Sequence, residues 1–329
     1  MKSNLKTGLL IFLIVSLFLV LSLYTFAESE KEYTIYVVVH GGIADPAWQL
    51  NYRGAKAAAE LFPDINLNYV GPPDYKLEEF MAYIEAAINS QPDALVCTLT
   101  APEAMDESLR AAIAGGLPVI AINAPDARPS NESIPVLTYV GISSFYEAGE
   151  LPALTILKNF IPERALYVNH HPGAFHIEEA GKGFVETMEA AGVPCEQLVV
   201  GPDPIQAAEL TIGYLKAHPD TQAIAHPNVT MLEVLVGRLK DEGYKPGEDI
   251  VLGTVFDPSE GCLNLMEKGE VLFANDQQMY LQGFYGVLFA YMKAKYNFAP
   301  PLPPVGTGPI VLTKQDVPIV RGLIKEGYR

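Results

Sequence analysis

The chain of 329 residues has only three cysteines and one tryptophan, and no long apolar run follows residue 23. Cys97, Cys195 and Cys262 are too few for a disulfide framework, so the fold has to rely on a hydrophobic core, and we expect Cys97 to be a buried small hydrophobe. Basic residues are scarce, with 22 Lys and Arg against 39 Asp and Glu and a net charge of −17. A surface of this sign repels phosphate backbones, which argues against a nucleic-acid partner.

Several motifs of enzyme active sites are missing. There is no Walker-type phosphate loop, no G-x-G-x-x-G after an expected strand, no G-x-S-x-G elbow and no C-x-x-C pair. His170, His171 and His176 are close in sequence, but no Cys or His pair at zinc-site spacing completes them. Glu178 and Glu179 are adjacent, which is more typical of a solvated helix face than of glycosidic cleavage. We therefore expect no metal, no cofactor and no catalytic residue.

Residues 1–27 have the features of an export signal. Lys2 and Lys6 precede an apolar run from Leu9 to Leu23, and Thr25-Phe26-Ala27 provides a small-x-small cleavage site. The alternative is an uncut membrane anchor, although the run is short for a spanning helix of about 20 residues. Cleavage would remove two lysines and no acid, which takes the net charge from −17 to −19. We expect the mature protein in the periplasm or at the extracytoplasmic cell surface.

The rest of the chain alternates short apolar runs with segments of helical periodicity. We expect strands at 33–39, 65–70, 94–99, 117–122, 136–140, 165–168, 197–200, 223–225, 250–255, 271–274 and 309–312. We expect helices from Asp45-Pro46, at 76–89, 102–115, 144–160, within 173–192, near 204–217 and 228–243, and at 279–296 and 315–325, with 124–135 as loop and 300–308 as linker. Such alternation predicts parallel sheets with helices on both faces, and the restart near 162–164 suggests two similar α/β lobes.

The segment 33–60 places polar and aromatic residues at the end of the first strand. A strand from Tyr33 to Val39 runs into a glycine-containing loop, and Asp45-Pro46 then begins a helix. Ligands of open α/β sheets bind beyond the carboxyl ends of the strands, so His40, Asp45 and Trp48 lie where a small molecule would be held. The alternative is that Asp45 only caps the helix and Trp48 only fills the core.

Polar residues recur at the ends of the other expected strands. Each alone would be ordinary turn chemistry, but together they suit a polyol, because planar amides and carboxylates exchange hydrogen bonds with hydroxyls. The indole of Trp48 would offer a flat apolar face to a sugar ring. The full set comprises His40, Asp45, Thr98, Asn123, Asn169, His170, Asn228, Asp257, Asp276 and Gln277.

Five segments resemble the sugar-binding proteins of ABC importers, and within them the simple-sugar branch of the ribose-binding-protein-like group. They are H-G-x-x-x-D-P-x-W at 40–48, A-L-x-V-N-H at 165–170, G-K-G-F at 181–184, P-N-V at 227–229 and D-Q-Q-x-Y-L-Q-G at 276–283. The resemblance implies a type I periplasmic binding protein, with two Rossmann-like lobes of parallel sheet joined by a three-crossing hinge. It places the N-terminal lobe at 28–138 plus 277–306 and the C-terminal lobe at 139–276 plus 307–329, with crossings near 138–140, 275–277 and 305–308.

The resemblance also implies ligand contacts at matching positions, most directly at Asp45, Trp48, Asn123, Asn228 and Gln277, and less directly at Asp257 and Asp276. The chain departs from relatives at three places. Ala47 replaces an aromatic residue, Ala124 replaces an arginine, and the stretch Glu178-Glu179-Ala180 lacks another arginine. These departures argue against ribose and anionic sugars, and His170 or His176 could act as replacement donors.

We therefore expect a monomeric solute-binding protein that captures a neutral monosaccharide or polyol by hinge closure and delivers it to the permease of an ABC importer. The first lobe would contribute Asp45, Trp48 and Asn123, the second Asn169, His170, Asn228 and Asp257, with Asp276 and Gln277 at a crossing. The alternatives are a secreted sugar-active α/β enzyme and a receptor for a sugar-like signal with the same fold.

Overall fold

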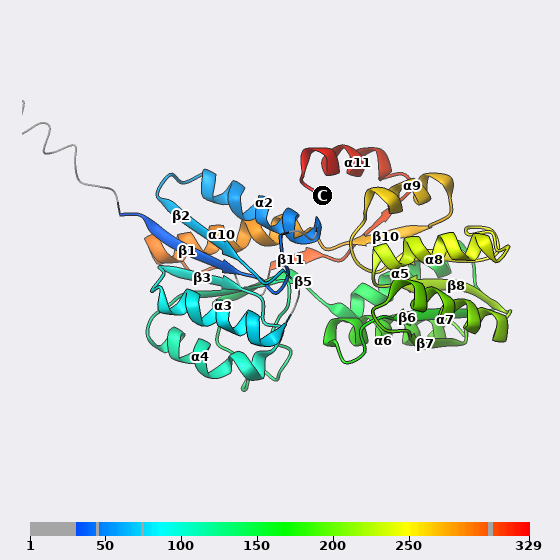
Figure 1. Ribbon diagram of the computed structural model, residues 1–329, viewed down its shortest axis with the longest axis horizontal. Helices are drawn as coiled ribbons and strands as arrows, with labels where there is room; N and C mark the ends of the chain where they lie inside the picture. The colour runs from blue at the N-terminus through cyan, green and yellow to red at the C-terminus, as the bar shows by residue number, and fades with distance from the viewer. Residues whose placement is uncertain (1–30, 44–45, 74–75, 302–304) are drawn as a thin grey trace, which may run out of the picture.

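The structure is a computed structural model that describes residues 31–43, 46–73, 76–301 and 305–329. The predicted export signal and Asp45 lie outside these residues. In the described part of the chain, twelve strands form two six-stranded sheets, which lie side by side with helices around each (Figure 1). Across these same ranges, no helix has the length and apolar character needed to cross a membrane.

The first sheet has the order β11-β5-β4-β3-β1-β2, and all its neighbouring strands pair in parallel. Its strands are β1 (Tyr33–Val38), β2 (Ile65–Val70), β3 (Ala94–Cys97), β4 (Val119–Ile122), β5 (Thr138–Ile142) and β11 (Val305–Gly308). Its helices are α2 (Pro46–Glu60), α3 (Leu77–Asn89), α4 (Pro102–Ala114) and α10 (Met279–Tyr296). Successive side chains of β3 point to opposite faces, so Val96 packs with α2 and α10 while Leu95 and Cys97 pack with α3 and α4. We call this sheet and these helices the first lobe.

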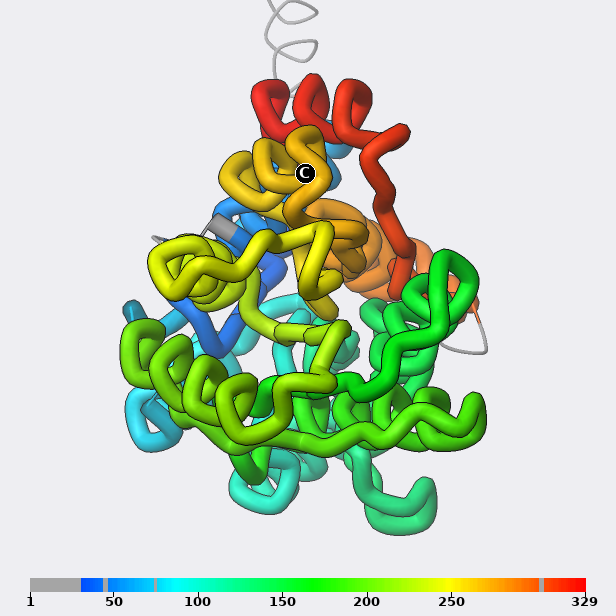
Figure 2. Tube along the Cα trace, turned by 90° about the vertical axis from the view of Figure 1, so that its right-hand side faces the viewer, coloured from blue at the N-terminus to red at the C-terminus, as the bar shows by residue number. Residues whose placement is uncertain are grey.

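The second sheet has the order β12-β10-β9-β8-β6-β7, in which only the edge strand β12 is antiparallel to its neighbour. Its strands are β6 (Arg164–Asn169), β7 (Cys195–Val199), β8 (Thr221–His226), β9 (Val251–Thr254), β10 (Phe273–Asp276) and β12 (Ile310–Thr313). Its helices are α5 (Phe145–Asn159), α6 (Phe175–Ala190), α7 (Pro204–Ala217), α8 (Val229–Asp241), α9 (Glu260–Lys268) and α11 (Val317–Glu326). α5 and α6 cover one face, and α7, α8, α9 and α11 cover the other, with α11 beyond α9 at one end (Figure 2). These elements form the second lobe.

The described chain passes between the lobes after β5, between β10 and α10, and at Pro309 between β11 and β12. β5 and β11 pair wholly within the first sheet. Residues 139–142 and 307–308, which the resemblance places in the C-terminal lobe, are part of strands of the first sheet. The reason is that hydrogen bonding continues to the end of both strands, and the chain turns away only after it.

Two elements were not expected from the sequence. Residues 305–308 form the strand β11 rather than linker, although a V-G-T-G strand has little intrinsic β propensity; pairing with β5 supplies the hydrogen bonds. α9 was not predicted at all, because nine residues give little periodicity. Its ends carry clear signals, since the Ser259 hydroxyl accepts from the Cys262 amide and Gly269 adopts a left-handed conformation at its C-terminus.

A close helix pair built on glycines braces each lobe. In the first lobe, a Cβ at Gly54 of α2 would lie 1.9 Å from the Tyr280 carbonyl oxygen of α10. In the second, a Cβ at Gly149 of α5 would lie 1.7 Å from the Ala180 carbonyl oxygen of α6. Only a residue without a side chain lets the two backbones approach this closely.

Candidate functional site

Gln277 connects strand ends from both lobes. Asn123, which follows β4 of the first lobe, donates from Nδ2 to the Gln277 Oε1 at 3.0 Å. Gln277 in turn donates from Nε2 to the carboxylate of Asp257, which follows β9 of the second lobe, at 2.5 Å. The structure therefore brings three predicted ligand residues, distant in sequence, into one hydrogen-bonded chain.

The backbone around this chain is held in an uncommon conformation. Asn123, Asp257 and Gln278 have φ values of 61°, 49° and 55°, which lie in the left-handed region. Asn and Asp tolerate this region better than other residues, but it remains less favourable than the right-handed or extended regions. Such positions are often found where a fold positions side chains for function.

A second set of hydrogen bonds ties the second and third crossings together. The Gln277 carbonyl accepts from Gln282 Nε2 at 3.0 Å and from the Thr307 hydroxyl at 2.8 Å. Gln278 Nε2 donates to the Thr307 carbonyl at 2.6 Å. Asp276 is buried, accepts from the Gln278 amide at 2.7 Å and forms an ion pair with Arg329. These contacts place Asp276 in the framework of the hinge, while its contact with ligand stays a prediction.

Asn169 is also directed toward the protein. Its side chain is fully buried, and its Nδ2 donates to Glu178 at 3.0 Å and to Gln197 at 2.9 Å. Its Oδ1 accepts from the His171 amide at 2.9 Å. In this conformation Asn169 shapes the loop that presents His170, and both of its amide protons are occupied.

His170 and Asn228 lie around the buried His226. The His170 and His226 rings are 6.0 Å apart, and the buried Nδ1 of His170 has no hydrogen-bond partner among the described residues. The backbone amide of Asn228 donates to His226 Nδ1 at 3.0 Å, which assigns the His226 proton to Nε2. Burial lowers the pKa of His170 to about 4 and that of His226 to about 3, so both are neutral at pH 7.

The side chain of Asn228 is divided between two tasks. Its Oδ1 caps α8 by accepting from the Met231 amide at 3.0 Å. Its Nδ2 makes no hydrogen bond to another residue of the described chain and remains available to a ligand oxygen. Asn228 is therefore both a structural cap and a candidate donor.

Trp48 lies largely in the core of the first lobe, with 7% of its surface exposed. Its indole packs against Gly41, where a Cβ would be 1.9 Å from Nε1, and its ring contacts His40 edge-on at 4.8 Å between centroids. His40 Nδ1 lies 3.0 Å from the Thr98 hydroxyl. Stacking of Trp48 on a sugar remains a prediction, because most of the ring is covered by protein.

Histidines of the two lobes also interact electrostatically. Burial, followed by the positive charge that His176 would carry, lowers the pKa of His40 to about 3. His40 belongs to the first lobe and His176 to the second, so this electrostatic effect acts between the lobes. His176 itself is exposed and lies beside Phe145 and Phe256, with ring centroids 5.9 and 6.1 Å away.

Sequence reasoning missed an interlobe cavity of about 450 Å³ beside the first crossing. Tyr139 lines it from the first lobe, and Phe145 and Phe175 from the second. Each aromatic residue alone resembles ordinary core in the sequence. The one sequence feature that could have indicated this cavity is Phe175, an aromatic residue beside His176 at the start of a helix.

The described chain has no metal-binding cluster and no activated thiol. Within the described ranges, no group of three or more His, Cys, Asp or Glu side chains could hold a metal ion. Cys97, Cys195 and Cys262 are buried and unpaired, and burial raises the pKa of each thiol to about 12. The buried position expected for Cys97 is thereby confirmed, and none of these thiols is a ready nucleophile at neutral pH.

Comparison with known families gives a match over most of the chain. A family model described as a periplasmic binding protein domain matches residues 35–297. The xylose/arabinose-binding protein XylF of Sulfolobus acidocaldarius is 26% identical over an alignment of 243 residues, and the match covers 70% of this chain. The chain spans 59% of the length of that relative.

Solved structures with the same fold include two sugar transport proteins. A periplasmic sugar-binding protein of an ABC sugar transporter from Legionella pneumophila matches with a TM-score of 0.75 and 26% identity, over 84% of this chain and 100% of its own. A carbohydrate transporter from Acidothermus cellulolyticus, solved with myo-inositol, matches with a TM-score of 0.77 and 24% identity, over 91% of this chain and 100% of its own. Two parallel-stranded lobes joined by three crossings are thus a known arrangement, and the fold expected from the sequence is confirmed.

Proposed function

The chain belongs to the periplasmic binding protein domain family, and we propose that it is an extracytoplasmic solute-binding protein for a neutral monosaccharide or polyol. It would bind this ligand between its lobes and deliver it to the permease of an ABC importer. We further propose that residues 1–27 are removed on export and that the mature protein is a monomer.

The observation that carries this proposal is the chain from Asn123 through Gln277 to Asp257. One side chain at a crossing holds a residue from each lobe, so a ligand that replaces these hydrogen bonds would contact both lobes at once. A ligand that bridges two lobes binds the closed arrangement better than the open one, and it shifts the population toward closure.

The chemistry of the strand ends favours an uncharged, hydroxyl-rich ligand. Asn123, Asn228 and Gln277 offer amides, Asp257 offers a carboxylate, and the buried imidazoles are neutral. Hydroxyl groups can donate to the carboxylate and accept from the amides, and the bond to a charged group is the stronger kind. The relatives agree in kind, since one is named for xylose and arabinose and another was solved with myo-inositol.

Asp45 and Trp48 complete the proposed first-lobe wall, and His170 the second. With its proton on the unpartnered Nδ1, the His170 imidazole would donate to a ligand oxygen and would partly replace the arginines that ribose-type relatives carry. The protein would bind its ligand without converting it, as its relatives do. A receptor for a sugar-like signal would use the same pocket and differ only in its partner.

A thermal-shift screen tests the proposal, with D-xylose, L-arabinose, D-ribose, D-glucose, D-galactose and myo-inositol as probes. A ligand that binds only the native state raises the unfolding midpoint by mass action, and calorimetry then gives its affinity. We expect at least one neutral sugar or polyol to raise the midpoint and to be recovered unchanged. A screen without any shift would contradict sugar binding, and recovery of a converted product would favour the enzyme alternative.

A further inference from the structure

The interlobe cavity of about 450 Å³ has a different character from the polar hinge. Leu99, Ala121 and Tyr139 line it from the first lobe, and Phe145 and Phe175 from the second. Phe175, the first residue of α6, leaves 48% of its surface exposed although it is a large aromatic residue. A cavity of this size with mostly apolar and aromatic walls is typical of a small-molecule site.

Most polar side chains that line this cavity are already bonded to the protein. The Tyr139 hydroxyl donates to the Asn123 carbonyl at 2.7 Å, and the Ser143 hydroxyl donates to the Gly308 carbonyl at 3.1 Å. The Tyr146 hydroxyl donates to the Glu186 carboxylate at 3.0 Å. The Ser144 hydroxyl caps α5 by accepting from the Glu147 amide at 3.1 Å. A sugar ring placed here would give up hydrogen bonds to water without full replacement, which is unfavourable, whereas an apolar group would not.

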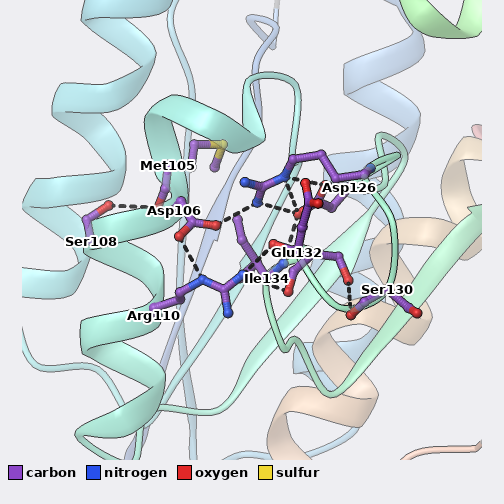
Figure 3. Close-up of polar contacts among 10 residues, drawn as sticks. Met105, Asp106, Ser108, Arg110, Asp126, Ser130, Glu132 and Ile134 are labelled. Carbon is purple, nitrogen blue, oxygen red and sulfur yellow. Dashed lines mark hydrogen bonds and ion pairs between the residues drawn. The ribbon is translucent and has the colours of Figure 1, made fainter.

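The loop that forms one wall is fixed in place by ion pairs (Figure 3). Asp126 accepts from the Ile134 amide at 2.8 Å and pairs with Arg128 at 2.7 Å. Arg128 also pairs with Asp106 of α4 at 2.7 Å, and Asp106 pairs with Arg110 at 2.7 Å. The Asp126 carboxylate is thus occupied, and the wall is preorganised rather than free to fill the cavity itself.

The cavity adjoins the proposed sugar contacts on both lobes. Tyr139 holds the carbonyl of Asn123, and Phe256, the residue before Asp257, lies 6.4 Å from Phe145 between ring centroids. From this juxtaposition we infer that the ligand carries an uncharged apolar substituent on its sugar, an alkyl or aryl aglycone, which occupies the cavity. The inference rests on the proposed sugar-binding function and names the class of sugar derivative.

Glu179 makes the inference more specific. It also lines the cavity, and its carboxylate forms no hydrogen bond or ion pair with another described residue. A second negative charge nearby would be repelled, so the carboxylate of Glu179 excludes an anionic substituent. An aryl group that bears a carboxylate should bind more weakly than the plain aryl group.

The test compares phenyl with methyl glycosides of D-xylose, L-arabinose, D-glucose and D-galactose by calorimetry. For the sugar that binds, we expect the phenyl glycoside to bind at least about tenfold more tightly than the methyl glycoside, because burial of an aromatic ring is favourable. Phe175→Ser should bring this ratio close to one while the methyl glycoside keeps its affinity. Ile205→Ser, at another exposed apolar residue of the same lobe, on α7, should leave the ratio unchanged.

Two further variants locate the effect. Ala127→Phe fills the cavity from the loop and should reduce phenyl glycoside binding. Glu179→Gln should remove the disadvantage of the 4-carboxyphenyl glycoside relative to the phenyl glycoside. Equal affinities of phenyl and methyl glycosides, binding of free sugars alone, or a ratio that Phe175→Ser does not change would each overturn the inference and leave sugar binding intact. Failure of every free sugar and glycoside to bind would overturn the proposed function and the inference together.

Discussion

The two lobes share a framework but differ at the ends of their strands. Each sheet has five parallel strands in corresponding order with one added edge strand, and each lobe packs a helix pair through glycines. The first lobe ends β1 and β3 with one imidazole–hydroxyl pair, His40 and Thr98. The second gathers His170 and Asn228 around His226. Equal perturbations of the framework should therefore have equal effects, whereas perturbations of the strand ends should not.

The largest effects are expected from the glycines of the helix pairs. Gly54→Val and Gly149→Val each place a side chain within 2 Å of a carbonyl oxygen on the partner helix, so the helices have to separate. We expect each to lower the free energy of unfolding by about 3 kcal/mol, which urea denaturation monitored by circular dichroism would measure. Gly213→Ala in α7 is the control, because no atom lies within 4 Å of its Cβ, and it should stabilise by about 0.5–1 kcal/mol. An effect confined to one lobe would contradict the idea of an equivalent framework.

Gln277 belongs to neither lobe alone, and its removal should affect binding rather than folding. We expect Gln277→Ala to weaken sugar binding by about 1.5–3 kcal/mol, the usual range for hydrogen bonds that involve a charged partner. Calorimetry with the sugar found in the thermal-shift screen measures this loss. Gln222→Ala, whose side chain accepts from the Glu163 amide away from the crossings, should leave affinity unchanged. Unchanged affinity in Gln277→Ala would remove Gln277 from the site.

Much of the framework could be predicted from the sequence. β2 at 65–70, α7 at 204–217 and α10 at 279–296 were predicted with the bounds that the structure has, because each is a periodic or continuous apolar segment with clear ends. β11 could not be predicted, since two of its four residues are glycines, which disfavour a strand, and pairing with β5 supplies its hydrogen bonds. Residues at strand ends were likewise predictable, because the alternation of strands and helices determines where each strand stops.

How those residues interact could not be predicted. Asn123 and Gln277 are 154 positions apart, and nothing in either segment indicates that the two side chains bond to each other. Asn169 follows a strand as expected, yet Glu178 and Gln197 take up its amide protons and turn it inward. The apolar cavity escaped notice because its walls come from both lobes, and each residue alone is indistinguishable from core.

The histidines of the second lobe predict a dependence of stability on pH. His226 is 1% exposed, and burial lowers its pKa to about 3 in the folded state. In the unfolded chain the His226 imidazole binds a proton near pH 6.5. The contribution of His226 to the free energy of unfolding is therefore complete above pH 6.5 and is lost as the pH falls toward 3. At pH 5 this single group should cost about 2 kcal/mol relative to pH 7.

His226→Asn removes the titrating group but keeps an acceptor for the backbone amide of Asn228. The difference in unfolding free energy between pH 7 and pH 5 should therefore be about 2 kcal/mol smaller in this variant than in the parent protein. His218→Asn provides the control. His218 is a half-buried residue that stacks on Tyr214, and it precedes β8, at the end opposite His226. An identical pH dependence in His226→Asn and the parent would contradict a neutral buried His226.

The smallest expected effect separates the two tasks of Asn228. Its Oδ1 caps α8, so Asn228→Ala should lower the free energy of unfolding by about 1 kcal/mol, in addition to any loss of ligand affinity. Asn228→Ser keeps a capping oxygen but has no amide to donate, so it should retain stability in urea denaturation and still bind sugar less tightly in calorimetry. If the serine variant binds as well as the parent protein, Asn228 only caps its helix, and the polar contacts of the second lobe have to come from Asp257 and His170. A loss of binding without a loss of stability would instead show that one side chain serves the framework with its oxygen and the ligand with its nitrogen.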